Sequence, residues 1–216
     1  MIQEMLSCEE YTVDIDLNTL SPTDVYFSMI QTLVPRPIAW VLSENADGRF
    51  NLAPFSYFTA VSSNPPLVMI SVGKKPDGSD KDTHVNIKTR QHFVIHIPSR
   101  EQLEVMNQSS ATLPAEQSEV DELHLETVSF AGFSLPRLKD AKIAFGCECY
   151  EIHNIGNTPQ AMILGRVDKI YIDDEVLVFD AKNRYKVDTN KLDPVARLGA
   201  SEYLLGGEVT KLDRPF

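Results

Sequence analysis

Alternating apolar and polar positions predict two β-hairpins in this chain. In the first, Ile38 to Glu44 and Arg49 to Ser62 form the strands, and Asn45-Ala46-Asp47-Gly48 supplies the Asx and Gly residues of a tight reversal. In the second, the strand-like runs over residues 143–156 and 158–173 meet at a turn signal over residues 154–157. Both patterns are typical of antiparallel strands joined by short turns.

Two shorter segments extend the predicted sheet. Residues 67–73 form a continuous apolar run, which is typical of a strand covered on both faces. Residues 92–98 alternate like a strand. Many antiparallel strands with few helices predict a mainly β fold, a β-barrel with helical decoration.

The remaining segments contain helix signals. Ser21-Pro22-Thr23-Asp24 resembles a capped helix start and predicts a short packing helix that ends before Pro35. A second helix is predicted after Asp82 or Thr83, and a third from residue 99 to about residue 109. The acid-rich residues that follow, to His124, are compatible with a helix or with a mobile excursion.

Pro54 interrupts the longest predicted strand. Proline has no N–H to give to a neighbouring strand, so Pro54 indicates a sheet edge, a bulge or a local break. Asn51 and Ser56 lie beside it among apolar residues, a composition that suits the lining of a site for a flat heteroaromatic ligand. An ordinary hydrogen-bonded edge strand has the same composition, and residue chemistry alone favours that simpler interpretation.

A lysine-bearing loop precedes the second predicted helix. Lys74, Lys75 and Lys81 lie within ten residues, and Thr83 follows them. Lysines and hydroxyls before a helix N-terminus suit a phosphate, because free N–H groups and the helix dipole point toward it. Three aspartates dilute the positive charge, so a solvated surface loop is an equal alternative.

Length and charge limit the classes of function. The 216 residues suit a single domain, with a core over about residues 26–180 and a C-terminal element over about residues 181–216. A formal net charge of -11 disfavours partners such as nucleic acid or an anionic membrane surface. The first residues lack the positive and apolar parts of a secretory signal, and no run is long enough to span a membrane, so we expect a cytoplasmic protein.

The cysteines and histidines do not indicate a metal site. Cys147 and Cys149 would face the same side of a strand, where buried packing thiols are favoured over metal or redox use. His92 and His96, four residues apart on a strand, would be separated by about 13 Å, too far to share one metal. The sequence also lacks the motifs of Rossmann dehydrogenases, P-loop NTPases, zinc proteases and α/β-hydrolases.

Several motifs together resemble one protein family. VPRPIAWV, then DGRFNLAPFSYFTAVSSNPPLVMISVG and KDTHVNI, with PVARLGASEY near the C-terminus, resemble the flavin reductase-like family of FMN-binding split-barrel proteins. The resemblance extends from about Tyr26 to about Tyr203. It implies a Greek-key split β-barrel that holds FMN without a covalent bond, near the subunit interface of a homodimer.

The resemblance also implies which residues contact the cofactor. Arg36 and the segment around Pro54 would contact the flavin or its ribityl chain, the strand end at Gly73 would follow the same wall, Lys81 and Thr83 would hold the phosphate, and Tyr203 with its neighbours would close the site. The full set is Arg36, Asn51, Ala53, Pro54, Phe55, Ser56, Ser71, Val72, Gly73, Lys81, Thr83, Arg197 and Tyr203. For Arg36 the alternative is a surface arginine held rigid by its flanking prolines.

The motifs leave three hypotheses for function. The first is an FMN flavoprotein oxidoreductase, an NAD(P)H-dependent flavin reductase that passes hydride through flavin N5 to a small-molecule redox substrate. The second is an FMN carrier or sensor with the same barrel and no turnover. The third is a split barrel for another ligand such as haem. No residue pattern distinguishes NADH from NADPH, names the electron acceptor or assigns a catalytic residue.

Overall fold

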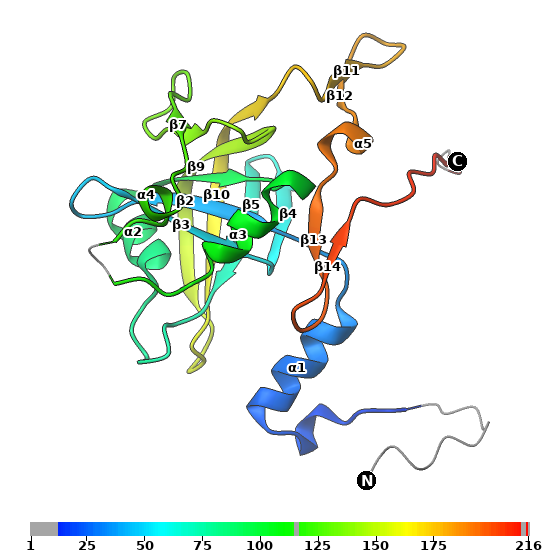
Figure 1. The fold of residues 1–216 in the computed structure, drawn as a ribbon. Coiled ribbons are helices and arrows are strands. Elements are labelled where there is room, and N and C mark those ends of the chain that lie inside the picture. Colours follow the sequence, from blue (N-terminus) through cyan, green and yellow to red (C-terminus); the bar gives the residue numbers. More distant parts are fainter. Residues whose placement is uncertain (1–12, 115–116, 213–214, 216) are drawn as a thin grey trace.

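A seven-stranded antiparallel sheet forms the body of the protein, seen in a computed structural model that describes residues 13–114, 117–212 and 215 (Figure 1). The strands follow one another in the order β3-β2-β6-β9-β10-β5-β4. Their bounds are β2 (Ala39–Glu44), β3 (Phe50–Phe55), β4 (Phe58–Ser63), β5 (Pro66–Val72), β6 (His92–His96), β9 (Ile143–Asn154) and β10 (Ala161–Ile172).

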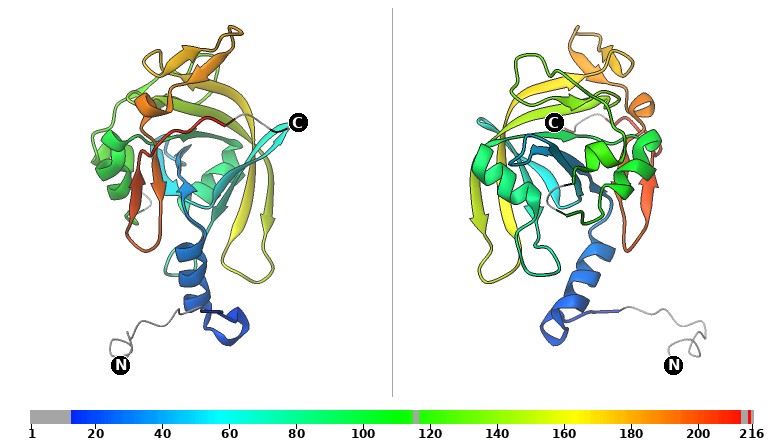
Figure 2. Two further views of the ribbon diagram at one scale, coloured as in Figure 1. Left: turned by 90° about the vertical axis from the view of Figure 1, so that its right-hand side faces the viewer. Right: turned by 60° about the vertical axis from the view of Figure 1, so that its left-hand side comes forward.

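The sheet is rolled into a barrel because its two edge strands are neighbours in sequence. Between β3 and β4 there are only Ser56 and Tyr57, so three Cα steps of 3.8 Å, about 11 Å in all, must connect the two edges. In a flat sheet, six strand spacings would place these edges about 29 Å apart. Figure 2 shows the resulting curvature. The two edge strands therefore meet at the Ser56–Tyr57 break. Beyond it, β3 pairs with β2 and β4 pairs with β5.

Both predicted hairpins are present. β2 pairs with β3 from Ala39 opposite Phe55 to Glu44 opposite Phe50, and β9 pairs with β10 along nearly their whole lengths. The predicted strand from Arg49 to Ser62 is divided into β3 and β4. The division follows Pro54 by one residue, which agrees with the expectation of an edge or a local break.

The outer edge of β3 explains why Pro54 is tolerated there. The Leu52 N–H points away from β2 and donates to Glu119 Oε2 at 2.9 Å, and Ser118 Oγ donates to the carbonyl of Phe50. Pro54 lies two residues beyond Leu52, so its missing N–H falls on the same outward side of the strand. The presence of proline at position 54 therefore costs no hydrogen bond between strands.

Two apolar clusters lie on opposite faces of the sheet. The inner cluster draws on six strands and includes Val41, Ile70, Phe93 and Ile163, all nearly inaccessible to water. The outer cluster is centred on Trp40, whose Nε1 donates to Ser109 Oγ at 2.8 Å. Cys147 and Cys149 both belong to the inner side, and burial raises the pKa of each thiol, as expected of packing cysteines.

Short helices and strands cover the outer cluster and the barrel ends. The predicted second helix is α2 (Asp82–Arg90), although Lys81, rather than Asp82 or Thr83, is its N-cap. The predicted third helix is a 3-10 turn (Arg100–Gln102) that continues as α3 (Leu103–Gln108). The acid-rich segment contains the single turn α4 (Glu119–Glu122), and β7 (Thr127–Val128) pairs with β8 (Arg137–Leu138).

The N-terminal helix and the C-terminal strands form a separate layer beside the barrel. Ser21 caps α1 (Pro22–Thr32), as predicted, and α1 follows a 3-10 turn (Leu17–Thr19). The chain then enters β1 (Arg36–Pro37), which pairs with β13 (Val195–Arg197), and β13 pairs with β14 (Tyr203–Leu205). A small hairpin, β11 (Leu177–Phe179) with β12 (Tyr185–Val187), and α5 (Thr189–Leu192) precede β13.

The prediction that α1 is a packing helix is wrong for most of its surface. Figures 1 and 2 show α1 projecting away from the barrel, and Ile30 is its one buried residue. Tyr26, Phe27 and Leu33 each expose more than half of their surface, with fractions of 56%, 53% and 56%. Within one chain, α1 therefore leaves an apolar face uncovered.

A buried histidine ties three strands together. His96 is fully buried on β6; its Nδ1 lies 3.0 Å from the Trp40 carbonyl on β2, and its Nε2 accepts from the Leu138 N–H on β8 at 3.0 Å. Because Nε2 is an acceptor, the proton resides on Nδ1, which donates to Trp40. The pKa of His96 is lowered from 6.5 to about 4, mainly by burial and to a smaller extent by the positive charge of Arg137, against the opposing hydrogen bond to Trp40.

We expect this histidine to make stability depend on pH. The lowered pKa means that the unfolded chain takes up the proton first, so the free energy of unfolding falls as pH drops from 6.5 toward 4, by about 3 kcal/mol. Urea unfolding at a series of pH values measures this slope. His96→Gln should be less stable at neutral pH and lose the slope, whereas substitution of the exposed His153 should keep it; an unchanged slope in His96→Gln would contradict the assignment.

Candidate functional site

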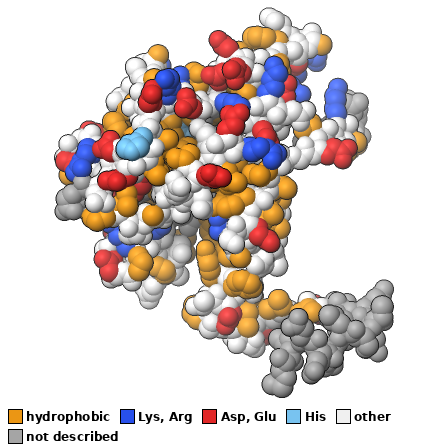
Figure 3. All heavy atoms as spheres, in the orientation of Figure 1, with side chains coloured by type: hydrophobic (Ala, Val, Ile, Leu, Met, Phe, Trp, Pro, Cys, Tyr) orange, Lys and Arg blue, Asp and Glu red, His pale blue; other side chains and the backbone are white. Residues whose placement is uncertain are grey.

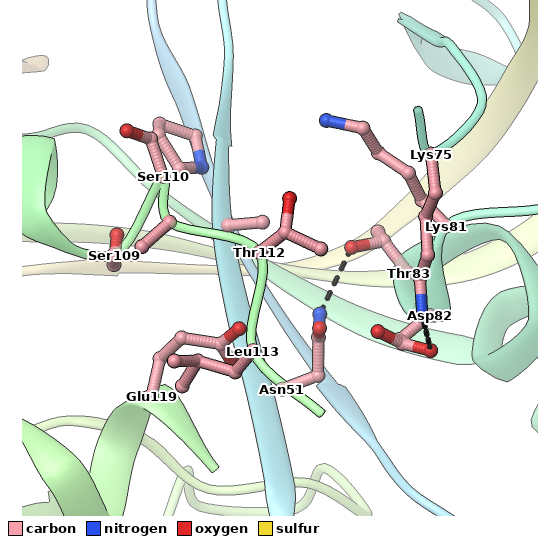
Figure 4. A pocket seen from close by; sticks show the side chains of 13 residues that line it. Asn51, Lys75, Lys81, Asp82, Thr83, Ser109, Ser110, Thr112, Leu113 and Glu119 are labelled. Carbon is pink, nitrogen blue, oxygen red and sulfur yellow. Dashed lines mark hydrogen bonds and ion pairs between the residues drawn. The ribbon is translucent and has the colours of Figure 1, made fainter. Parts of the chain in front are cut away.

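Two cavities adjoin each other along the open edge of β3. The first, narrow and enclosing about 60 Å³, is lined by Asn51, Ala53, Pro54, Lys75, Lys81, Asp82, Thr83, Ser109, Ser110, Ala111, Thr112, Leu113 and Glu119 (Figure 4). The second, of about 250 Å³, is lined by Tyr26, Ile30, Arg36, Ile38, Pro54, Ser56, Met106, Asn107, Ser110, Arg197, Ala200 and Tyr203. Pro54 and Ser110 belong to both, so Pro54, just before the break in the strand, lies between the two compartments.

A buried network of polar side chains forms one wall of the first cavity. Asn51 Nδ2 donates to Thr83 Oγ1 at 2.9 Å and to Ser43 Oγ at 3.2 Å, which links β3 to α2 and β2. Asn86 Nδ2 continues the network to Ser43 Oγ and Asn45 Oδ1. Buried polar groups that satisfy one another hold a fixed geometry. Asn51 and Thr83 are therefore presented to the cavity in defined orientations.

The start of α2 brings hydrogen-bond donors and charge to the same cavity. No side chain of the described residues caps the helix at Lys81, so its first N–H groups have no side-chain partner, beside the Thr83 hydroxyl. The Lys81 ammonium lies 5.7 Å from the centre of the Phe55 ring and, within the described ranges, forms no ion pair. These groups form an electropositive end to the cavity.

Carboxylates moderate that charge. Lys75 Nζ is paired with Asp82 Oδ1 at 2.8 Å, as Figure 4 shows, so Lys75 is already neutralised in part. Burial raises the pKa of the Glu119 carboxyl, against the opposing hydrogen bond from the Leu52 N–H. In the described part of the lining, Glu119 and Asp82 are thus the two carboxylates that face the electropositive end of the cavity.

Arg36 holds the second cavity together. Its Nη1 donates to the carbonyls of Ile30 and Leu33 at 2.7 and 2.6 Å, and its Nη2 donates to the carbonyl of Leu198 at 2.8 Å. Its Nε donates to Ser56 Oγ at 3.4 Å, so the side chain joins the C-terminal end of α1, the strand break and the C-terminal layer. Arg36 is only 4% exposed. The Arg36 guanidinium thus links these three segments by hydrogen bonds, and it also lines the second cavity.

Arg197 brings a second guanidinium to this cavity. It lies opposite Arg36 in the β1–β13 pairing, stacks over the Tyr203 ring at 4.5 Å and donates to the Ala200 carbonyl. Tyr203 Oη donates to Asn107 Oδ1 at 2.8 Å, which fixes the ring on which Arg197 rests. Among the residues that the structure describes, the lining contains two arginines and no carboxylate, so the second cavity is electropositive.

Comparison with known proteins identifies the family. Residues 31–188 match the model of the flavin reductase like domain. The chain belongs to the flavin reductase-like family. Over 202 residues it is 37% identical to an uncharacterised protein of Halalkalibacterium halodurans, a match that covers 92% of this chain and 94% of the relative.

Solved structures similar to this chain share its fold. Nitrilotriacetate monooxygenase component B from Bacillus cereus superposes with a TM-score of 0.84 at 29% identity, covering 94% of this chain and 100% of that one. The 2-nitrobenzoate 2-nitroreductase of Pseudomonas fluorescens gives 0.83 at 28% identity, with coverage of 94% and 96%. A split-barrel protein from Shewanella frigidimarina, 19% identical, gives 0.78 with coverage of 92% and 96%. The predicted split β-barrel is confirmed.

The structure brings most of the residues predicted from the flavin reductase-like motifs to the two cavities. Asn51, Ala53, Lys81 and Thr83 line the first, Arg36, Ser56, Arg197 and Tyr203 line the second, and Pro54 lines both. The remaining four lie outside these linings. Phe55 and Val72 are buried in the inner cluster, the Ser71 N–H donates to the Tyr57 carbonyl, and Gly73 lies beside Gln160.

Sequence reasoning missed residues that come from distant segments. Residues 109–113 and Glu119 line the first cavity, and Tyr26, Met106 and Asn107 line the second. One local signal was available, the run Ser109-Ser110-Ala111-Thr112 of small and hydroxyl-bearing residues directly after a predicted helix. No pattern marks the others, because their positions depend on how the helices pack on β3.

Two further classes of feature are not found in the described part of the chain. No group of three or more His, Cys, Asp or Glu side chains is placed to hold a metal ion. Among the helices of the described residues, none has the length and apolar character needed to cross a membrane.

We expect loss of Arg36 to destabilise the fold. Arg36→Met leaves the buried carbonyl of Ile30 and the partly buried carbonyls of Leu33 and Leu198 without their donor, and should lower the free energy of unfolding by about 3 kcal/mol. Urea denaturation measures the change. The matched control is Arg184→Met, at a side chain 71% exposed, which should change stability by about 0.5 kcal/mol at most. Equal stability of the two variants would show that the Arg36 contacts are dispensable.

Proposed function

We propose that this flavin reductase-like protein is a cytoplasmic FMN-dependent oxidoreductase, an NAD(P)H-dependent flavin reductase. The observation that carries the proposal is the joining of a narrow, donor-rich cavity to a wider electropositive one across Pro54. A phosphorylated chain fits the first, and a planar ring fits the second. The family membership and the likeness to a monooxygenase component and a nitroreductase support redox chemistry.

The first cavity fits the phosphate of FMN in chemistry and in charge. The start of α2, the Thr83 hydroxyl and the Lys81 ammonium supply N–H, O–H and a positive charge at one end. A phosphate ester of nearly two negative charges would be met there by charge-assisted hydrogen bonds. Asn51, fixed by its bonds to Thr83 and Ser43, would face the hydroxyls of the ribityl chain.

The second cavity suits the ring of the cofactor. Tyr203, Met106 and Ile38 provide apolar and aromatic surface, whereas Arg36 and Arg197 provide positive charge without a competing carboxylate. Bound FMN would supply hydride transfer at N5, which no side chain provides. The two guanidiniums would favour the negative charge that the pyrimidine edge takes up on reduction. Ser110 and Pro54 would orient the ring at the border of the two cavities.

A homodimer completes the proposal. The uncovered face of α1, with Tyr26, Phe27 and Leu33, is an apolar surface on a helix that projects from the barrel, and Figure 3 shows hydrophobic side chains around it. Such surfaces are typical of protein interfaces. Because Tyr26 also lines the second cavity, a partner seated on α1 would cover the ring compartment.

Loss of the Lys81 charge should weaken FMN binding more than riboflavin binding. In Lys81→Gln, one charge-assisted contact to the phosphate is lost, so the dissociation constant for FMN should rise about tenfold, while that for riboflavin, which lacks the phosphate, should stay the same. Quenching of flavin fluorescence measures both constants. Lys186→Gln, at an exposed position on β12, is the control. An equal effect on both flavins would contradict a phosphate role for Lys81.

Turnover is tested by anaerobic reduction of the FMN-loaded protein. NADH or NADPH should bleach the visible flavin absorbance at a rate that saturates with the nicotinamide concentration. Re-oxidation by added free FMN, nitroaromatic compounds or oxygen then ranks the acceptors. If the protein binds FMN tightly but neither nucleotide bleaches it, the protein is a flavin carrier or sensor. If FMN does not bind, the flavin proposal itself is wrong.

A further inference from the structure

A third cavity, of about 490 Å³, lies on the other side of the lysine-bearing loop. Its walls are the loop residues Lys74 and Asp80, the α2 residues His84 and Lys88, and the turn between β9 and β10. None of its lining residues belongs to the first or second cavity. It is therefore a separate compartment that the proposed flavin site does not use.

The side chains of two neighbouring lysines in this loop face different cavities. Lys74 forms an antiparallel bridge with Asp80, and the Lys75 N–H donates to the Ser79 carbonyl at 2.8 Å, so residues 74–80 form a small hairpin. Neighbouring side chains on such a hairpin point to opposite faces. Lys75 accordingly lines the first cavity and Lys74 lines the third.

The third cavity carries a local positive charge in an acidic protein. Lys74 and Lys88 face it against one carboxylate, Asp80, which pairs with Lys74 at 3.2 Å. The whole chain carries a formal net charge of -11. A cluster in which cations outnumber acids is therefore a departure from the protein's average surface, and it favours an anionic ligand.

His84 adds a buried polar group to this wall. The residue is 7% exposed, and its Nδ1 lies 3.6 Å from Asp80 Oδ1, beyond hydrogen-bond distance. Among the described residues Asp80 is the ionisable group paired with this ring, and the ring lines the cavity. The imidazole is thus an ion-pair neighbour of Asp80 that also lines the cavity, where a ring nitrogen can donate to an incoming anion.

The opposite wall suits a base and a sugar. The β9–β10 turn contributes the amide side chains of Asn154, Asn157 and Gln160 and the hydroxyl of Thr158, beside apolar Ile152. Amides offer both donors and acceptors, as the edge of a nucleobase or a ribose requires. The volume is within the range of small-molecule sites and exceeds what a lone phosphate needs.

We propose that the third cavity binds a nucleoside monophosphate unit, with its phosphate on Lys74, Lys88 and His84 and its base against the amides of the β9–β10 turn. The unit belongs either to a free nucleotide or to the adenylate half of a dinucleotide whose other half lies elsewhere on the protein. Both sources present the same phosphate and the same nucleoside to this cavity.

Calorimetric titration with 5′-AMP tests the site, on the protein with and without excess FMN. The wild type should bind AMP in both states, and adenosine should bind at least about tenfold more weakly. Lys74→Gln/Lys88→Gln should weaken AMP binding about tenfold and change FMN affinity by less than about twofold. Lys186→Gln is the matched control for loss of charge on an exposed lysine and should behave like the wild type.

The outcomes separate this site from the flavin proposal. Binding of AMP that FMN blocks would place it in the flavin cavities and overturn the proposal, as would no binding at millimolar AMP, equal binding of adenosine, or an unaffected double variant. Failure of FMN to bind would leave the AMP result standing. If FAD excludes AMP while FMN does not, the adenylate half of FAD is the occupant; if AMP binds in the presence of FAD, the occupant is a separate nucleotide.

Discussion

The architecture depends on the two-residue connection between β3 and β4. These strands are the two edges of a seven-stranded sheet, and Ser56 and Tyr57 alone join them. A link this short forces the sheet to roll until its edges touch at one corner, and beyond that corner β3 pairs with β2 only. The free edge of β3 is thereby exposed to α2, α4 and the segment after α3. Both cavities of the proposed flavin site lie along this edge.

Two buried polar assemblies keep the open edge in a fixed geometry. On one side of Pro54, Asn51 ties β3 to α2 through Thr83. On the other side, Arg36 joins the end of α1, Ser56 and the carbonyl of Leu198, which is 162 residues away in sequence. Helix α4 accepts the outward-pointing Leu52 N–H of β3 through Glu119. The walls of the cavities are thus supported by hydrogen bonds between elements distant in the chain, and loops complete the linings.

Local signals account for what the sequence could predict. The hairpins, the cap of α1 and the strand break near Pro54 depend on neighbouring residues, and the structure confirms them. The roles of Arg36 and Glu119 depend on distant partners. Flanking prolines suggested a rigid arginine or a ligand contact, but the carbonyls that Arg36 binds come from α1 and the C-terminal layer. The exposed face of α1 was also unpredictable, because the capping signal that predicts the helix does not say whether the helix packs within its own chain.

A crystal structure of the protein grown with excess FMN tests the central claim most directly. The account predicts density for the phosphate at the start of α2, between Lys81 and Thr83, and for the ring in the second cavity beside Arg197, with the chain passing Pro54 between them. Density for the phosphate or the ring at another place, with the edge of β3 bare, would contradict the account. So would a rearranged barrel in which the two edges pair along their length and close the cavities.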